Sequence, residues 1–332
     1  MFKYLICINP LGLMYGSAGA FLSPENLVGR SGAKFPPEAA TLSGLFFSVN
    51  QVQKLWDKKQ LSNDLSVAGP FWSKTNNPEY FYVPIPWTKI IAEDESSEWE
   101  FKNKKWHCEN SELTPDYQWQ TINYWNYSAE RIRSNGYAEK VPWNFVSVLH
   151  PHLKNDERCT LKNEDDTKGG LFLEYSVQLD SEYCLVYLST QALPNGWYRF
   201  GGENHIVEIN SFELPDNSPI LELLRQPIKD KFALITPGIW GSNRISHRQP
   251  QDNSFPETMQ MLTDKPVPYR YRSQGTLGRG RYAVPAGSVY VLKEPINKPW
   301  WEWDEKWFPN EGYSLKKVGC GLCLPVEIQG VN

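Results

Sequence analysis

The chain has 332 residues, a formal net charge of −4 and a sequence pI of about 5.8. Hydrophobic residues make up 40% of it and include 14 Trp, 17 Tyr and 15 Phe, so the composition excludes global disorder. The mild acidity also excludes a protein that coats nucleic acid by bulk charge. Any contact with nucleic acid must therefore be local, or shared with partner subunits.

No run of apolar residues is long enough to span a bilayer, so no membrane segment is expected. The apolar N-terminal run is interrupted by Asn9-Pro10, which makes it short for a signal peptide and favours a buried first strand. The six cysteines show no dense disulfide framework. We therefore expect reduced thiols and a cytoplasmic location.

In the first half, Phe2–Ile8 is short and apolar and predicts a buried strand, followed by a glycine-rich loop. Pro36 and Pro37 mark a helix start, and apolar residues at helical spacing predict a helix over Glu38–Lys54. Further strands are expected at Gly69–Trp72 and Tyr80–Ile85. Residues 87–143 are charged, aromatic and weakly periodic, and we interpret them as an insertion with little regular structure.

In the second half, the charged segment Lys154–Gly170 predicts a linker or an exposed hairpin. The remaining expected elements are strands at Leu171–Leu179, Tyr183–Ser189, His205–Ile209, Lys231–Thr236, Ser288–Leu292 and Val318–Ile328, and a short helix at Pro219–Gln226. Strands alternating with a few helices, twice over, indicate two α+β domains with antiparallel sheets. We place them at residues 1–160 and 161–332.

The loop Gly12–Gly32 is a first candidate for binding phosphates, because its five glycines and three serines can offer backbone N–H groups. Two cations lie at its end. The candidate residues are Gly16, Ser17, Gly19, Arg30, Ser31 and Lys34. An ordinary loop before a helix is the alternative interpretation.

A second candidate is the arginine- and glycine-rich stretch Tyr269–Tyr290. Between Arg244 and Arg281 there are seven Lys or Arg residues against three acids, a local charge of +4. Arginine matches phosphate oxygens, glycine lets the backbone approach a ligand, and histidine can stack on a base. The candidate residues are Arg244, His247, Arg248, Arg270, Arg272, Arg279 and Arg281. A solvated arginine-rich loop is the alternative.

Five separated segments, in this order, resemble one family: FPPEAATLSG (35–44), FGGENHIVEI (200–209), LITPGIW (234–240), AVPAGSVYVL (283–292) and VGCGLCLPVEI (318–328). Together they resemble the third subunit of the Cmr complex, the type III-B CRISPR effector, which belongs to the crRNA-capping group of the RAMP superfamily. The resemblance covers both halves of the chain.

The resemblance implies two ferredoxin-like (RRM-type) domains. It also implies a non-enzymatic crRNA-binding subunit without a cofactor, which holds the repeat-derived 5′ tag of crRNA and meets target RNA only indirectly. Its implied protein partners are the large polymerase-like subunit and the first backbone subunit. The C-terminal segment resembles the superfamily's glycine-rich signature loop, so Gly319 and Gly321 become candidate RNA contacts.

Two stretches, Trp99–Trp143 and Trp300–Phe308, match nothing in this family. The final glycine motif also carries Cys320 and Cys323 where small or apolar residues are usual. A single CxxC is half a zinc site and no second half accompanies it, so thiols without a metal are expected.

Two other classes of function stay open at this point. A RAMP endoribonuclease that processes precursor crRNA would use His247 as its general base. A small-molecule enzyme would need a tryptophan-lined pocket, but no acid/base pair or cofactor fingerprint accompanies one. We interpret the tryptophans as core and interface anchors, and expect Trp300, Trp301 and Trp303 to be exposed for binding the large subunit.

Overall fold

The computed structural model describes residues 1–15, 35–151, 171–201, 204–241, 245–270, 272–273, 276–277 and 280–329. Of residues 15, 171–174, 272–273 and 276–277 it describes the backbone alone. Most of the predicted glycine loop and the whole of Lys154–Gly170 therefore lie outside the described residues.

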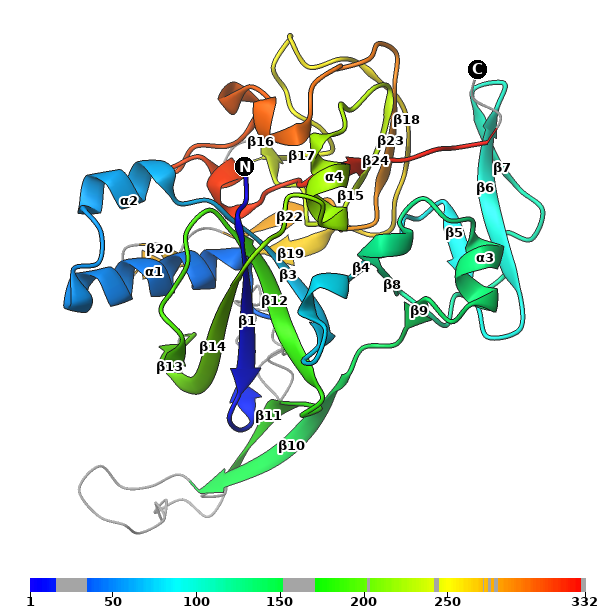
Figure 1. The fold of residues 1–332 in the computed structure, drawn as a ribbon. Coiled ribbons are helices and arrows are strands. Elements are labelled where there is room, and N and C mark those ends of the chain that lie inside the picture. Colours follow the sequence, from blue (N-terminus) through cyan, green and yellow to red (C-terminus); the bar gives the residue numbers. More distant parts are fainter. Residues whose placement is uncertain are drawn as a thin grey trace, which may run out of the picture.

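The largest sheet in the described part of the chain has eight strands and runs through the middle of the molecule (Figure 1). In spatial order they are β13 (Gly196–Phe200), β14 (His205–Glu213), β1 (Tyr4–Pro10), β12 (Tyr183–Ser189), β3 (Val67–Lys74), β4 (Tyr82–Pro84), β8 (Trp119–Thr121) and β9 (Ala138–Glu139). Leu5 and Ile6 of β1 point to opposite faces and both are fully buried, so this sheet is covered on both sides at β1. The predicted buried first strand is confirmed.

The four central strands of this sheet are all antiparallel to their neighbours. Side by side, these strands follow the order β14, β1, β12, β3. In chain order they are the fourth, first, third and second, so the first strand lies between the third and the fourth, and the second lies on the far side of the third. The first two are joined by α1 (Ala39–Gln53) and α2 (Lys58–Asp64). The predicted helix is confirmed: Leu42 and Phe46 are fully buried, and the helix ends where Lys54 adopts a left-handed conformation.

A second, four-stranded sheet repeats this strand order. Its strands are β18 (Thr258–Leu262), β23 (Val289–Leu292), β15 (Lys231–Leu234) and β24 (Cys323–Pro325), preceded in the chain by α4 (Pro219–Arg225). Its neighbouring strands are again antiparallel. Here the described connections hold no α-helix; the last one contains the 3-10 helices η4 (Trp300–Glu302), η5 (Glu305–Trp307) and η6 (Leu315–Val318).

The sheets do not divide at the predicted boundary between residues 160 and 161. Strands β12 and β14 pair with β1, and β12 also pairs with β3, so the first sheet needs strands from both sides of that boundary. The chain passes from the first sheet to the second between Glu213 and Pro219. The change in composition at Lys154–Gly170 was therefore no guide to where one sheet ends and the next begins.

The stretch 87–143 is more regular than its weak periodicity predicted. It contains β5 (Lys89–Ile91), β6 (Ser96–Lys102), β7 (Lys105–Cys108), α3 (Ala129–Ser134), the 3-10 helix η3 (Ile122–Tyr124) and the last two strands of the first sheet. This insertion is attached to the C-terminal end of the chain. The Trp125 indole Nε1 donates to the Pro325 carbonyl at 2.8 Å, and the Phe101 N–H donates to the Gln329 carbonyl at 3.0 Å.

The other described elements are smaller. They are β2 (Met14–Tyr15), β10 (Trp143–Pro151), β11 (Leu171–Leu179), β16 (Trp240–Gly241), β17 (Ser246–His247), β19 (Val267–Tyr269), β20 (Arg272–Ser273), β21 (Thr276–Leu277), β22 (Arg281–Ala283) and the 3-10 helix η2 (Pro78–Tyr80). Strands β10 and β11 form a long ribbon that extends away from the body of the molecule (Figure 1). Every helix in the described part of the chain is too short or too polar to cross a membrane.

The aromatic segment Trp300–Phe308 packs inside the protein, which corrects its expected role as an exposed surface. Trp300 and Trp303 are buried and Trp301 is half-buried. Trp303 contacts Phe232 of the second sheet edge-to-face, with the ring centroids 5.4 Å apart. The segment therefore covers the core of the second sheet instead of presenting aromatic anchors to a partner.

One charged residue of the insertion, Lys89, is half-buried. The Lys89 ammonium donates to the Trp125 carbonyl at 2.8 Å, and burial lowers the pKa of Lys89 to about 8. Glu98 opposes this shift. The pKa of Lys89 in the folded state thus lies below its value in the unfolded chain. Desolvation of the charged ammonium therefore costs stability at neutral pH.

We predict that stability rises with pH above about pH 8, because the unfolded chain then holds a proton that the folded chain has released. Between about pH 8 and about pH 9.5 this group should add up to about 2 kcal/mol to the free energy of unfolding. Urea unfolding at several pH values measures the rise in the natural chain and in Lys89→Met, which should lack it. Equal pH slopes for the two proteins would contradict the prediction.

Candidate nucleic-acid interface

Most of the candidate residues lie outside the described residues. This holds for the whole N-terminal set, Gly16, Ser17, Gly19, Arg30, Ser31 and Lys34, and for Arg244 and Arg279. Arg272 lies in β20, where the backbone alone is described. Arg248 is exposed, and Arg270 is half-buried. These residues stay candidates on the strength of the sequence.

Arg281 does not belong to an exposed arginine surface. It lies on β22, is only 5% exposed, and its guanidinium forms an ion pair with the Glu311 carboxylate. A guanidinium enclosed in this way is not available to a phosphate of a surface-bound RNA. The local charge of +4 counted from the sequence therefore overstates the positive charge that is exposed to solvent in this stretch.

The glycines of the signature-like loop are also buried. Gly319 ends η6 with a φ of 74°, and a Cβ atom there would lie 2.6 Å from the Cβ of Ala68 on β3. Gly321, with a φ of 61°, lies against the Trp240 ring. Both positions need glycine, but the reason in this structure is the close contact of the C-terminal loop with the first sheet and with Trp240.

His247 lies in a small hairpin next to β22. It pairs with Trp240 across β16 and β17. Gly241, which follows Trp240, has a φ of 89°, and a Cβ atom there would clash with the His247 imidazole. The Ser246 hydroxyl accepts a hydrogen bond from the Tyr282 N–H at 3.0 Å. His247 is half-buried and neighbouring Arg248 is exposed, so the hairpin holds these two candidates beside β22.

The cysteines of the C-terminal motif are buried. The Cys320 Sγ accepts from the Ile239 N–H at 3.2 Å and donates to the Ile239 carbonyl at 3.3 Å. Burial raises the pKa of Cys320 to about 12 and raises that of Cys323 well above its usual value. Both thiols are therefore protonated at neutral pH and act as packed core side chains. Among the described residues, no three His, Cys, Asp or Glu side chains form a group that could hold a metal ion.

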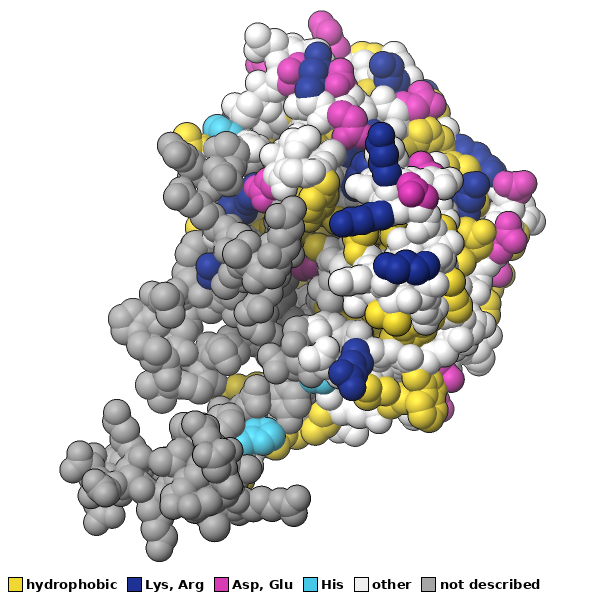
Figure 2. Space-filling view, turned by 90° about the vertical axis from the view of Figure 1, so that its left-hand side faces the viewer, with side chains coloured by type: hydrophobic (Ala, Val, Ile, Leu, Met, Phe, Trp, Pro, Cys, Tyr) yellow, Lys and Arg dark blue, Asp and Glu magenta, His cyan; other side chains and the backbone are white. Residues whose placement is uncertain are grey.

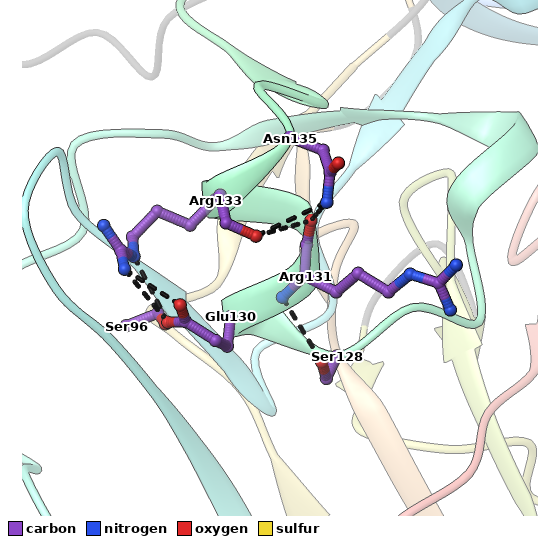
Figure 3. Close-up of polar contacts among 7 residues, drawn as sticks. Ser96, Ser128, Glu130, Arg131, Arg133 and Asn135 are labelled. Atoms are coloured by element: carbon purple, nitrogen blue, oxygen red, sulfur yellow. Dashed lines mark hydrogen bonds and ion pairs between the residues drawn. The ribbon is translucent and has the colours of Figure 1, made fainter.

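A cleft in the insertion has a volume of about 490 Å³. Four carboxylates line it, from Glu98, Glu100, Glu109 and Glu130. Figure 3 shows how Glu130 bridges two elements: it accepts from the Ser96 hydroxyl at 2.9 Å on β6 and pairs with Arg133 at 3.0 Å on α3. This much negative charge repels phosphates, so the cleft is unsuited to RNA.

The opposite side of the molecule carries a different surface. The segment after α1 and the start of α2 expose Lys54, Lys58 and Lys59, and the edge strand β13 exposes Trp197 and Arg199. Figure 2 shows Lys and Arg side chains spread over this side. We did not identify these residues from the sequence. The available signal was the spacing of Trp197 and Arg199, which places an aromatic ring and a cation on one face of a strand.

No family model and no curated protein matches this chain. Among solved structures, it is similar to a chain of the cryo-EM structure of the type III-B Cmr-beta bound to cognate target RNA, with a TM-score of 0.46, 13% identity and 86% of each chain covered. It is similar to a chain of the crystal structure of the Csm1-Csm4 cassette in complex with AMPPNP, with a TM-score of 0.42, 12% identity and 99% of each chain covered. For the Csm3-Csm4 subcomplex in the type III-A CRISPR-Cas interference complex the TM-score is 0.39, the identity 12%, and the coverage 89% of this chain and 99% of the other. A likeness at this level assigns no function.

We predict that Gly319→Ala lowers the free energy of unfolding by about 3 kcal/mol, because the left-handed backbone and the contact with Ala68 both penalise a Cβ atom. The matched control is Gly136→Ala, where φ is 67° but nothing lies within 4 Å of the added atom. It should cost only about 1 kcal/mol. Urea unfolding compares the two variants, and equal losses would show that the close contact does not matter.

We also predict that Arg281→Met destabilises the protein by about 3 kcal/mol, since it leaves the Glu311 carboxylate without its ion-pair partner. Arg248→Met removes an exposed arginine from the same region and should change stability by less than about 0.5 kcal/mol. Thermal unfolding of both variants measures the difference. An unchanged melting temperature for Arg281→Met would return this residue to the surface candidates.

Proposed function

We propose that the chain is a crRNA-binding, non-catalytic subunit of a type III-B CRISPR effector, acting in the cytoplasm. In this proposal it holds the repeat-derived 5′ tag of crRNA and bridges the large polymerase-like subunit to the first backbone subunit. Its contact with target RNA is indirect. It needs no cofactor or metal for this role.

The observation that carries the proposal is the strand order shared by the two sheets. In each, the first strand lies between the third and the fourth, with the second outside the third, and neighbours are antiparallel. This is the order of a ferredoxin-like domain, and two such domains are what the resemblance implies. In the first sheet α1 and α2 join β1 to β3, but the described residues between β12 and β14 hold no α-helix. In the second sheet no described connection between strands holds an α-helix, so each sheet departs from the full pattern in its crossovers.

The five segments that resemble the family fall on this framework. Phe35–Gly44 leads into α1, Phe200–Ile209 spans the turn from β13 to β14, Leu234–Trp240 joins β15 to β16, Ala283–Leu292 ends in β23, and Val318–Ile328 contains β24. Three of them therefore belong to strands of the second sheet or their connections. The resemblance and the strand order support one another, because each was obtained without the other.

A binding role is favoured over catalysis by the surroundings of His247. A general base for RNA cleavage needs a substrate hydroxyl within reach and a stabilised charge nearby. Arg281 on the adjoining β22 is buried in its ion pair with Glu311 and cannot supply that charge, which leaves the exposed Arg248 beside His247 in the chain. Recognition of a single-stranded tag instead needs phosphate contacts and places where splayed bases can stack.

The test uses the purified full-length chain with RNA that carries the 5′ tag, in the presence of a chelator. We expect retention of intact RNA in a gel-shift assay, and equal retention by His247→Ala. RNA with a scrambled tag should bind more weakly. Co-expression with the large and the backbone subunits of the same effector should yield a ternary complex.

Two outcomes would contradict the proposal. Cleavage of repeat RNA that is lost in His247→Ala would assign the chain to the endoribonucleases instead. Failure of the chain to bind RNA at low salt, combined with failure to join either protein partner, would exclude a structural role in the effector.

A further inference from the structure

Trp197 is unusual among the tryptophans of this protein. All 14 lie within the described residues, and 12 of them are buried or half-buried. Trp87 sits at the border of exposure with 36%, whereas Trp197 is 72% exposed. Because exposing an indole to water is unfavourable, an exposed tryptophan on a regular strand calls for a partner.

The backbone of the hairpin fixes the direction in which Trp197 points. On β13, Tyr198 and Phe200 face inward, and the Tyr198 hydroxyl donates to the Pro194 carbonyl at 2.6 Å. The Phe200 ring packs edge-to-face on Tyr187 in the core, with the centroids 6.4 Å apart. Since side chains alternate along a strand, Trp197 and Arg199 must both point outward, about two residues apart on one face.

The outward face of the hairpin is mixed rather than apolar. Trp197 lies opposite Glu208 on β14, and Arg199 lies opposite Ile206. Farther along the same face of β14, Asn210 separates Glu208 from the exposed Phe212. The centre of a protein–protein interface is depleted of charged residues, which does not describe this face. An aromatic ring beside a guanidinium instead suits a nucleotide, whose base stacks and whose phosphate pairs.

Cations lie beside this face, and acids of the same region balance them. Residues 54–64 together with β13 and β14 contain four cations and four acids. The cations are Lys54, Lys58, Lys59 and Arg199, and all are exposed. Of the four acids, Asp57 is engaged in capping α2, where its carboxylate accepts from the Gln60 N–H at 2.9 Å. Helix α1 contacts β13, and α1, α2 and β13 lie on one side of the molecule (Figure 1).

We propose that single-stranded RNA binds across this side, with one base stacked on Trp197 and the adjacent phosphate on Arg199. From there the strand runs toward the lysines at the start of α2. The Glu208 carboxylate, opposite Trp197, repels a phosphate. The phosphate next to the stacked base is therefore expected at Arg199. This inference rests on the proposed RNA-binding function and deepens it, since it places an RNA-contacting surface away from the arginine- and glycine-rich stretch.

The test measures binding of a fluorescent oligouridine of about 12 nucleotides to the full-length chain by anisotropy, over a range of salt concentrations. Stacking on an aromatic side chain contributes enough that Trp197→Ala should weaken binding by between about 5-fold and about 150-fold. Its salt dependence should be unchanged, because no cation is lost. Trp197→Phe keeps a ring and should retain most of the affinity.

Two further variants separate stacking from charge. Arg199→Met should lower the slope of log K against log salt concentration by about 0.7, the value for one phosphate contact on a single strand. Tyr80→Ala removes an exposed aromatic ring from η2, and should bind RNA as the natural chain does. Thermal unfolding of all variants should match the natural chain, since both Trp197 and Arg199 are exposed.

The outcomes are distinguishable. If the natural chain binds RNA and Trp197→Ala binds it equally well, this surface is not used, while the proposed function stands. If the natural chain binds no single-stranded RNA at low salt, the inference and the RNA-binding part of the proposed function both fall. If Trp197→Ala keeps its RNA affinity but no longer co-purifies with a partner subunit, the face is a protein interface and the inference is wrong.

Discussion

The close approach of the C-terminal loop to the first sheet is the contact on which the arrangement of this protein depends. Gly319 presses against Ala68 of β3, where a single methyl group would not fit. Around it, the Lys317 ammonium donates to the Ser62 and Asn63 carbonyls at the end of α2. One continuous hydrophobic core then includes residues of both sheets. The two sheets therefore behave as one packed body, and the loop that joins them tolerates little substitution.

The sequence was sufficient for elements whose pattern is local. The strand at Tyr183–Ser189 and the helix after Pro37 appear where apolar spacing and proline placed them, because the residues that define them are adjacent in the chain. It was insufficient where the partner is distant. Burial of Arg281 depends on Glu311, 30 residues away, and no local pattern reports that pairing. The glycines at 319 and 321 were correctly singled out, but their partners, Ala68 and Trp240, show that packing explains them.

Opposite charges are segregated on this molecule. Carboxylates line the cleft of the insertion, while Lys54, Lys58, Lys59 and Arg199 are exposed on the side of α2 and β13, away from the insertion (Figure 1). The net charge of −4 averages over both and conceals them. A polyanion approaching the protein in solution would thus be oriented before contact, since the carboxylates of the cleft repel it and the exposed cations attract it.

In the first sheet, neighbouring strands come from distant parts of the chain, and this affects how the chain folds. Strand β1 is completed by β12 and β14, so about two hundred residues must be synthesised before its two neighbours exist. Until then an apolar strand and the inner face of α1 lack their partners and remain open to self-association. Pairings this far apart in sequence also fold slowly, because closing the loop costs entropy before any contact repays it. Chaperones would be most useful to this chain in that interval.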